Sequence, residues 1–523
     1  LKKNQVKNAV ELIDNGNTIP FIARYRKEVT GNLDDEKLRN LDDRLKYLRN
    51  LENRKEEIIR LIDEQGKLTK DLELKINNST ILTELEDIYR PFKPKKRTRA
   101  TQAKEKGLEP LAKIILKQNI KDENIEKIAS EYINIEKGVL NFKDAIDGAC
   151  DIIAEDISDN SEYRKMIRKI SYVTGKLFSL AANEDEKSTY DMYYNFSENI
   201  NKMPSHRTLA INRGEKEGFL KVKLEVNEEE IFEYLEKQII KKESIFTDIL
   251  KETIKEAYKR LIKPSIEREI RSEKFEEASE QAIKVFGVNV KNLLMAAPLK
   301  DMVIMGFDPA YRTGCKIAII DVTGKLLDYT TIYPTMPQND ITGATKTLLE
   351  LIEKHNVDMI AIGNGTASRE SEKFVADVIK KAKRKVYYTI VSEAGASVYS
   401  ASKLATEEYP DINVSIRGAI SIARRLQDPL AELVKIDPKA IGVGQYQHDV
   451  NQKRLAESLT GVVEDAVNKV GVDVNTATPS LLSYVSGINS SIAKNIVKYR
   501  DENGKLKTRK ELLKVPKLGK VAF

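Results

Sequence analysis

Apolar residues recur at three- and four-residue spacing through most of the first 300 positions. This period predicts amphipathic helices, which we expect up to about residue 180 and again over 228–295. Pro264 is expected to break the second helical stretch. A helix that begins near Ser265 should exceed 20 residues, or about 30 Å at 1.5 Å per residue. Strict alternation at 219–226 predicts one short strand, so the first part of the chain is expected to be mainly helical with a small β excursion.

The pattern changes at Met302, where short apolar runs rich in β-branched residues alternate with amphipathic segments. A meander of three strands followed by two strand–helix units predicts a five-stranded mixed sheet with right-handed crossovers, the order found in ribonuclease-H-like domains. The expected strands are 302–308, 316–321, 326–333, 357–363 and 386–392. The expected helices are 342–355, 366–383, 395–405, 414–427 and 429–436.

The C-terminal segment carries the signals of two helix-hairpin-helix motifs. Thr478 and Pro479 form a helix cap followed by a first-turn proline. The first motif would consist of helix 479–486, turn 486–490 and helix 491–500. Thr508 and Glu511 have the spacing of a capping box, which predicts a second short helix before a turn at 515–519.

Length and pattern together predict a multidomain, mainly α protein, because 523 residues exceed what one ordinary core can hold. One domain is expected to be α/β and ribonuclease-H-like, and the C-terminus to carry the helix-hairpin-helix motifs. The expected domains are a helical region at 1–190, a helical region with the β excursion and long bridging helix at 191–300, the ribonuclease-H-like domain at 301–436, and the helix-hairpin-helix region at 437–523.

Composition narrows the class of protein. The net charge of +7 comes from 88 Lys and Arg against 81 Asp and Glu, so the clustering of charge matters more than its sum. Cys150 and Cys315 lie far apart in the sequence, which predicts no disulfide framework and favours a reducing interior. No apolar run reaches the roughly 18 residues of a membrane span, and the three histidines have no metal-ligand spacing. We therefore expect a cytoplasmic protein with no membrane partner.

The densest basic cluster lies between Tyr89 and Lys106. Two prolines keep it extended, and a basic loop of this kind can contact phosphates without reading base sequence. A solvated surface loop is the alternative. The candidate nucleic-acid-binding residues here are Lys93, Lys95, Lys96, Arg97 and Arg99.

The two hairpin turns supply a second set of candidates, because turns between short helices let backbone N–H groups approach a phosphate. In the first turn Asn489 takes the place of a second glycine, and asparagine tolerates a left-handed backbone better than most residues. Lys494, Lys498 and Arg500 on the next helix can add counter-charge, with an ordinary helix surface as the alternative. The candidates in these turns are Gly487, Asn489, Lys494, Lys498, Lys517 and Gly519.

Asp308 ends the first expected strand of the sheet, where a ribonuclease-H-like nuclease would place a metal-binding carboxylate. Glu393 follows the fifth strand and is expected to face it. Such a site needs three or four converging acids, whereas Asn364 follows the fourth strand and the later helix offers Arg417 and Gly418. Asp308 and Glu393 are therefore vestigial candidates, and no catalytic residue, metal or cofactor is assigned. Mg²⁺ is expected as a cofactor only if the alternative holds, namely that the protein is a metal-dependent nuclease or Holliday-junction resolvase.

Five passages distributed in order along the chain together resemble the bacterial Tex family of transcription accessory proteins. They are Pro20–Glu28 (PFIARYRKE), Tyr89–Arg99 (YRPFKPKKRTR), Gly306–Cys315 (GFDPAYRTGC), Gly363–Glu370 (GNGTASRE) and Gly442–Asp449 (GVGQYQHD). The resemblance implies an N-terminal helical region with a helix-turn-helix-like part, a YqgF-type domain regarded as lacking nuclease activity, and tandem helix-hairpin-helix motifs. It also implies a C-terminal OB-fold RNA-binding module, which we expect to be missing because the sequence ends inside the second hairpin motif.

These observations favour a non-enzymatic transcription accessory protein that binds RNA or DNA through backbone phosphates, independently of sequence. The competing hypothesis is the nuclease or resolvase based on Asp308 and Glu393. A third hypothesis makes the helical half a docking platform for RNA polymerase or ribosome-associated proteins.

Overall fold

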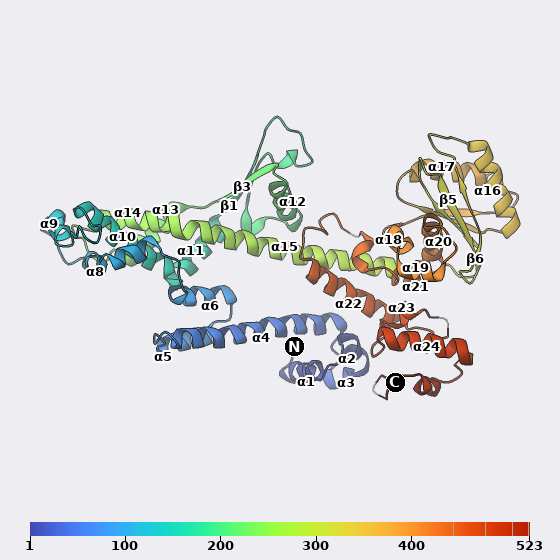
Figure 1. Cartoon of the computed structure of the whole chain (residues 1–523), viewed down its shortest axis with the longest axis horizontal. Coiled ribbons are helices and arrows are strands. Elements are labelled where there is room, and N and C mark those ends of the chain that lie inside the picture. The colour runs from blue at the N-terminus through green and yellow to red at the C-terminus, as the bar shows by residue number, and fades with distance from the viewer. Residues whose placement is uncertain (443, 476, 505, 521) are drawn as a thin grey trace. The chain divides into compact units, whose positions relative to one another are not determined.

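The computed structural model of the protein describes residues 1–442, 444–475, 477–504, 506–520 and 522–523. Its internal contacts divide the chain into two compact units. The helical unit comprises Asn40–Glu280, and the sheet unit comprises Leu1–Arg39 together with Gln281–Phe523. Two long helices, α4 (Asp35–Asp63) and α15 (Lys263–Leu294), contain the two points of division (Figure 1). Among the described residues, the helices are too short or too polar for one to cross a membrane.

The helical unit is built from short amphipathic helices whose caps follow local sequence. The side chains of Asn141 and Asn160, for example, accept hydrogen bonds from the first-turn N–H groups of α10 and α11. Its helices are α5 (Lys70–Asn78), α6 (Leu82–Tyr89), η1 (Arg90–Phe92), α7 (Arg99–Glu105), α8 (Glu109–Lys117), α9 (Ile125–Ser130), α10 (Phe142–Asp159), α11 (Ser161–Thr174), η2 (Asp191–Tyr193), η3 (Ile200–Lys202), α12 (Ser205–Lys216), α13 (Glu228–Ile239) and α14 (Thr247–Glu256).

The β excursion is larger than expected. The strands β1 (Lys176–Ala181), β2 (Asn195–Asn199) and β3 (Leu220–Glu225) form an antiparallel sheet in the order β2-β1-β3. The sequence predicted only the third strand and continued the helix to about residue 180. That expectation was wrong because α11 ends at Thr174 and Gly175 follows in an extended conformation, leading directly into β1.

Pro264 does not break the helical stretch. A π-helical segment, η4 (Ala257–Ile262), connects α14 to α15, and Pro264 is the second residue of α15. Proline lacks the N–H of a helical hydrogen bond, and at this point the run changes from π-helical to α-helical geometry instead of ending. The expected long helix is confirmed, with 32 residues in α15.

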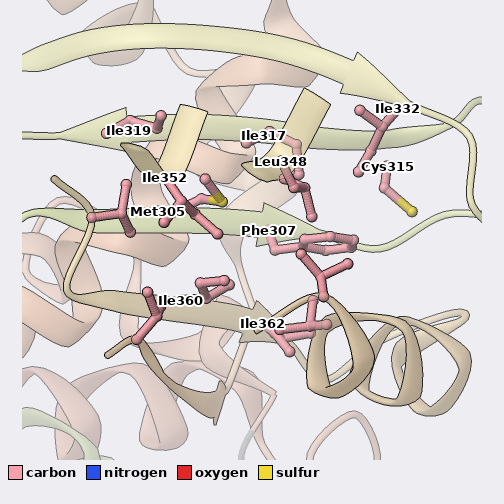
Figure 2. Close-up of a cluster of buried hydrophobic side chains, with 14 of the residues drawn as sticks. Met305, Phe307, Cys315, Ile317, Ile319, Ile332, Leu348, Ile352, Ile360 and Ile362 are labelled. Carbon is pink, nitrogen blue, oxygen red and sulfur yellow. The ribbon is translucent and has the colours of Figure 1, made fainter. Parts of the chain in front are cut away.

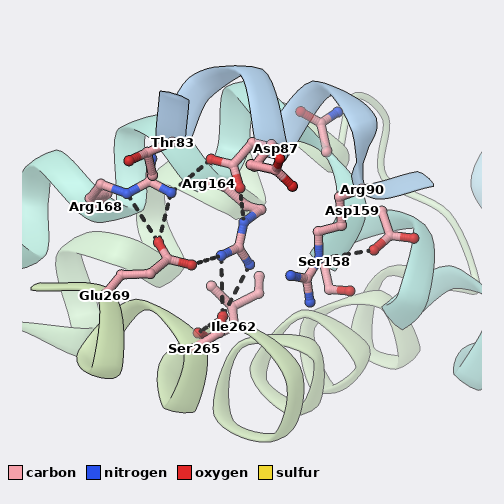
Figure 3. A network of polar contacts seen from close by, with 12 residues as sticks. Thr83, Asp87, Arg90, Ser158, Asp159, Arg164, Arg168, Ile262, Ser265 and Glu269 are labelled. Atoms are coloured by element: carbon pink, nitrogen blue, oxygen red, sulfur yellow. Dashed lines mark hydrogen bonds and ion pairs between the residues drawn. The ribbon is translucent and has the colours of Figure 1, made fainter. Parts of the chain in front are cut away.

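A buried network of charges lies among α6, α11 and α15 in the helical unit (Figure 3). The guanidinium of Arg164, fully buried, donates to Asp87 Oδ1 at 2.6 Å, to Glu269 Oε1 at 2.7 Å and to Ser265 Oγ at 3.2 Å. Arg168 donates to the second oxygens of the same two acids, at 2.7 Å and 2.8 Å. The network fixes how the three helices meet, because each buried charge needs its partners to offset desolvation.

The sheet unit contains the predicted five-stranded mixed sheet, in the order β6-β5-β4-β7-β8. The first three strands pair antiparallel, and β7 and β8 add in parallel on the other side of β4. The strands are β4 (Ile304–Asp308), β5 (Cys315–Ile320), β6 (Leu326–Ile332), β7 (Met359–Gly363) and β8 (Tyr387–Val391). This confirms the ribonuclease-H-like topology, including the meander and the two parallel additions.

Each face of this sheet is covered by helices. On one face, Leu348 and Ile352 of α16 (Ile341–His355) pack on Phe307 and its buried neighbours (Figure 2), and α17 (Ser368–Ile379) adds Val375. On the other face lies α20 (Val414–Gln427), against the central strands. Contact there is close: a Cβ at Gly306 would lie 2.0 Å from the carbonyl oxygen of Ala419, so only glycine fits.

The expected helix at 395–405 is two helices, α18 (Ala396–Ser400) and α19 (Lys403–Glu408). The break comes from Ser402, whose hydroxyl caps α19 by accepting from the N–H of Ala405 at 3.1 Å. The helix expected at 429–436 is shorter, as α21 (Pro429–Leu433), and Asp428 caps it as its Asp-Pro sequence indicates.

The remaining helices belong to the two ends of the chain. They are α1 (Lys3–Asp14), α2 (Ile19–Tyr25), α3 (Lys27–Thr30), η5 (Pro438–Ile441), α22 (Gln452–Val470), α23 (Pro479–Leu482), α24 (Ser490–Asn503) and η6 (Arg509–Lys514). Thr478 caps α23 as predicted. The capping box at Thr508 is not formed, because its hydroxyl accepts no cap bond and the Glu511 carboxylate accepts instead from the N–H of Lys507 at 2.9 Å.

Candidate nucleic-acid interface

The first hairpin turn connects α23 to α24 and is shaped by one glycine. Gly487 has φ of +85°, a left-handed conformation that favours glycine. Asn489 does not adopt the left-handed conformation expected of it. It is extended, with φ of −87°, and its side chain caps α24 by accepting from the N–H of Ile492 at 2.9 Å. The asparagine therefore starts the second helix of the motif.

The second turn follows η6 and lies against the start of α24. Its left-handed residue is Lys517, with φ of +67°, and not Gly519. The Lys517 amine lies 3.3 Å from the hydroxyl of Ser491, and the side-chain amide of Asn495 donates to the carbonyl of Pro516 at 2.8 Å. The two turns thus meet at the N-terminal half of one helix.

A small hydrophobic core supports both turns. Its buried side chains come from α23 and the residues just before it, from α24 and from the second turn, so the two motifs form one packed module. They are Ala477, Leu482, Ile492, Ala493, Ile496, Val515 and Leu518. Backbone groups held in this way are positioned before any ligand arrives, which reduces the entropy lost on binding.

Positive charge is concentrated in this module. Residues 467–523 contain eleven Lys and Arg and four Asp and Glu, and this excess of seven equals the net charge of the whole chain. Lys494 and Lys498 are exposed on α24, and Lys498 pairs only loosely with Glu502, at 3.8 Å. Arg500 has a structural role instead, because its guanidinium donates to two backbone carbonyls at 3.0 Å and 3.1 Å.

The basic cluster of the helical unit is exposed, but most of its charges have acidic partners. The pairs are Lys93 with Glu86, Lys95 with Glu155 and Asp159, Arg97 with Glu105, and Arg99 with Glu256. Within the described part of the chain, Lys96 has no ion-pair partner. The Arg97 and Arg99 side chains are 70% and 65% exposed, and such surface pairs contribute only about 0–1 kcal/mol. Phosphates can therefore replace these two acids at little cost.

Asp308, the last residue of the central strand β4, lies close enough to Glu393 for the two carboxylates to interact. Burial first, and then the negative charge of Glu393, raise the pKa of Asp308 to about 6, while Lys316 opposes the shift. The Glu393 carboxylate lies over a glycine cradle: a Cβ at Gly365 would be 1.6 Å from its Oε1, and one at Gly363 would be 2.4 Å from its Oε2. Its Oε2 is buried without a hydrogen-bond partner among the described residues.

Asn364, Arg417 and Gly418, which the sequence placed where further acids would be expected, make structural contacts. The Asn364 side-chain oxygen accepts from the N–H of Glu393 at 3.1 Å, so this amide clamps the backbone. Gly418 lies against Asp308, where a Cβ would be 2.9 Å from Oδ2. Arg417 turns away to four oxygen atoms of the 400–412 segment, at 2.9 to 3.3 Å. Across the described residues, no group of three or more His, Cys, Asp or Glu has a metal-binding arrangement.

Sequence reasoning missed one buried residue beside this pair. Arg425, on α20, donates to the carbonyls of Ser392 and Ala394 at 2.8 Å and 2.7 Å, and burial lowers its pKa despite the charges of Glu432 and Glu393. The signal for Arg425 was present in the sequence, because the preceding turns of the helix contain an almost continuous run of small and apolar residues. An arginine inside such a helix indicates a buried carbonyl or carboxylate partner.

Comparison with known proteins assigns these parts to one family. Four family models match in sequence order: a Tex-like protein N-terminal domain over residues 1–63, a Tex central region-like segment over 121–286, a Tex protein YqgF-like domain over 302–427, and a helix-hairpin-helix motif over 467–523.

Whole-chain relatives agree with these matches. The uncharacterized protein YdcI of Bacillus subtilis is 54% identical across 99% of this chain and 73% of its own length. The transcriptional accessory protein Tex of Neisseria gonorrhoeae is 47% identical across 99% of this chain and 69% of its own length. The human S1 RNA-binding domain-containing protein 1 is 37% identical across 99% of this chain and 53% of its own length. The chain belongs to the Tex family.

Proposed function

We propose that this protein assists transcription by binding the backbone of RNA or DNA, independently of sequence, at the helix-hairpin-helix module. The observation that carries the proposal is the meeting of two hairpin turns on one helix, within a module whose excess of positive charge equals the net charge of the chain. A relative bearing the name transcriptional accessory protein and another bearing the name S1 RNA-binding domain-containing protein support the same class of function.

Binding at this module would use backbone groups and lysines for different purposes. The N-terminus of α24, which follows the first hairpin turn directly, is suited to phosphate oxygens because the helix dipole favours negative charge there. Lys494 and Lys498, one turn apart, can neutralise neighbouring phosphates. The Lys517 amine can leave the Ser491 hydroxyl and bind a third phosphate. None of these contacts reads a base edge, so the affinity should depend on salt more than on sequence.

The ribonuclease-H-like domain has a scaffolding role in this proposal. Gly418 and Arg417 stand where a further metal-binding acid is required, and Asn364 is engaged with the backbone of Glu393. Two carboxylates without a third acid favour a domain without catalysis and without a resident cofactor. Cleavage of a branched or hybrid substrate with Mg²⁺, lost in Asp308→Asn, would replace this proposal with the nuclease alternative.

The basic cluster at 93–99 is a second, weaker contact for nucleic acid. Lys96, Arg97 and Arg99 are its exposed charges, and the proposal assigns Lys93 and Lys95 mainly to their acidic partners within the helical unit.

RNA polymerase and ribosome-associated proteins are the partners that a role in transcription implies, and the cytoplasm is the corresponding compartment. The domain boundaries near residues 190, 300 and 436 belong to the same proposal.

Fluorescence anisotropy with labelled single-stranded RNA, single-stranded DNA and duplex DNA tests the hairpin assignment. The double substitution Lys494→Ala with Lys498→Ala should weaken binding to all three ligands. The matched control is Lys346→Ala with Lys403→Ala, which removes two helical lysines of the same unit that likewise pair with a glutamate four residues on, at 4.0 Å and 3.7 Å. Equal effects of the two double variants would refute the assignment to the hairpin module.

A further inference from the structure

The N-terminal helices of the sheet unit pack against the hairpin module. Thr18, the residue before α2, has its hydroxyl 3.4 Å from the hydroxyl of Ser486, the residue before Gly487. At the other end of α2, the Arg24 guanidinium reaches the carbonyl of Lys469, at 3.5 Å, near the end of α22. One short helix therefore runs from the hairpin turn to the end of α22.

A second contact anchors the same segment. Arg39 donates to both oxygens of Asp465 on α22, at 2.6 Å and 3.1 Å, and to the carbonyl of Gly461 at 3.0 Å. This bidentate pair is partly buried, and its geometry is the kind that holds an arginine and a carboxylate in one orientation. The placement of α2 beside the hairpin is thus fixed by contacts along the whole N-terminal segment.

The two faces of α2 differ in how far their side chains are buried. Pro20, Ile22 and Ala23 are buried, whereas Tyr25 is 56% exposed and its ring lies 5.4 Å from that of Phe21. Helical spacing puts Thr18, Phe21 and Tyr25 on one side, so this aromatic pair continues the line that begins at the hairpin. At 1.5 Å per residue, Tyr25 lies about 10 Å along the helix from Thr18.

The residues next to this aromatic pair are positively charged. Arg24, Arg26 and Lys27 are exposed, and Arg26 lies 4.8 Å from the centre of the Phe21 ring. Among the described residues these three cations have no ion-pair partner, in contrast to most of the basic cluster at 93–99. Uncompensated cations interleaved with an exposed aromatic ring are the two features that single-stranded nucleic acid requires, namely backbone neutralisation and a surface for base stacking.

We propose that α2 extends the hairpin module into a site for single-stranded nucleic acid, in which Arg24, Arg26 and Lys27 hold phosphates and Tyr25 stacks on a base. The inference rests on the proposed function, because the hairpin turns hold the adjoining nucleotides. It adds what the hairpins alone do not supply, which is a preference for unpaired strands, since the bases of a duplex are not available to Tyr25.

The experiment compares Tyr25→Ala, Tyr25→Phe and Arg24→Gln in the full chain, with folding checked by circular dichroism. Binding to single-stranded RNA and single-stranded DNA should weaken about 5- to 30-fold in Tyr25→Ala, stay near the parent value in Tyr25→Phe, and leave duplex binding unchanged. Arg24→Gln should lower the salt slope of single-strand binding by about one. Tyr387→Ala is the control, because Tyr387 is 50% exposed in the same unit and has the Lys385 amine 4.8 Å from its ring centre.

Two results would overturn the inference: single-strand binding in Tyr25→Ala equal to that of the parent, or an equal loss for duplex and single strands. If Tyr25→Ala weakens binding to one of single-stranded RNA and single-stranded DNA more than to the other, the site prefers the nucleic acid with the larger loss. Its failure is distinguishable from failure of the proposed function. If Lys494→Ala with Lys498→Ala weakens binding to every ligand while Tyr25→Ala changes none, the hairpin assignment stands and the α2 site falls.

Discussion

The side-chain amide of Asn495 donates a hydrogen bond of 2.8 Å to the carbonyl of Pro516, and this bond joins the two hairpin turns. Asn495 belongs to α24, whereas Pro516 lies in the turn that follows η6. Through this bond the helix that carries Lys494 and Lys498 also positions the turn that carries Lys517. The arrangement of the proposed phosphate contacts therefore depends on one half-buried asparagine.

Asn495→Ala should loosen the second turn without unfolding the module. Loss of one such hydrogen bond costs about 1 kcal/mol, so amide hydrogen exchange at 515–519 should accelerate roughly fivefold and the affinity for nucleic acid should fall. The control is Asn503→Ala, which removes a bond of similar length, 2.9 Å from the Asn503 amide to the Tyr499 carbonyl, at the far end of the same helix. Equal exchange rates at 515–519 in the two variants would contradict this account.

Lys517→Gly should separate stability from binding. A non-glycine residue at φ of +67° carries a steric cost of about 1–2 kcal/mol, which glycine would remove. The greater conformational freedom of glycine in the unfolded chain would offset part of this gain. The unfolding temperature of the sheet unit should therefore stay the same or rise, while affinity for nucleic acid falls because one cation is lost. Calorimetry and anisotropy on the same sample measure both effects, and unchanged affinity would remove Lys517 from the interface.

Arg164→Met should destabilise the helical unit by about 3–5 kcal/mol, because Asp87 and Glu269 would keep their charges in a buried site with only Arg168 as partner (Figure 3). The unfolding transition followed by circular dichroism measures the loss. Arg97→Ala, which breaks an ion pair with a 70% exposed arginine, should change the same transition by less than about 0.5 kcal/mol. Similar effects of the two substitutions would argue against the network.

Asp308→Asn should stabilise the sheet unit at neutral pH. The pKa of Asp308 is about 6 in the folded protein against 3.8 as its ordinary value, so the folded state holds the proton more tightly and stability falls as the pH rises between these values. Removing the charge should return up to about 3 kcal/mol at pH 7.5 and almost nothing below pH 4.

Asp328→Asn should change the stability in the opposite direction and serves as the control for that measurement. Hydrogen bonds from Lys354 and then His355 hold the pKa of Asp328 below its usual range. Its contribution to stability is present above the ordinary pKa and is lost as the pH falls through the lowered one, so Asp328→Asn should destabilise the protein at pH 7.5. Unfolding temperatures of both variants and the parent between pH 4 and 8 would show the two trends diverging, and parallel curves would contradict them.

The sheet could be predicted from sequence because each strand has its own signal. The runs at β4, β5 and β7 are apolar and β-branched, and the turns between the first three strands contain glycine. The strands β1 and β2 had no such signal, since β1 follows a helix after a single glycine and has polar residues among its apolar ones. The strand pairing that stabilises β1 lies in residues 15 to 50 positions away and is not visible in a local window.

The candidate site was predicted less completely than the fold, for a related reason. The hairpin turns were found from glycine, proline and cap signals, but the role of Asn489 as a helix cap depends on where α24 starts. Ion pairing across the basic cluster at 93–99 involves acids up to 157 positions away, such as Glu256 for Arg99. The contact of Thr18 with Ser486 joins residues 468 positions apart, which no periodicity or motif reveals.

If nucleic acid binds at the hairpin module through backbone phosphates, binding must release counterions and depend on salt. The most direct test is the slope of the logarithm of the binding constant against the logarithm of salt concentration, measured for the parent chain and for Lys494→Ala with Lys498→Ala. We expect a steep negative slope for the parent, with a magnitude smaller by about two in the double variant, on ligands of unrelated sequence. A slope that is the same in both proteins, or near zero in the parent, would contradict it.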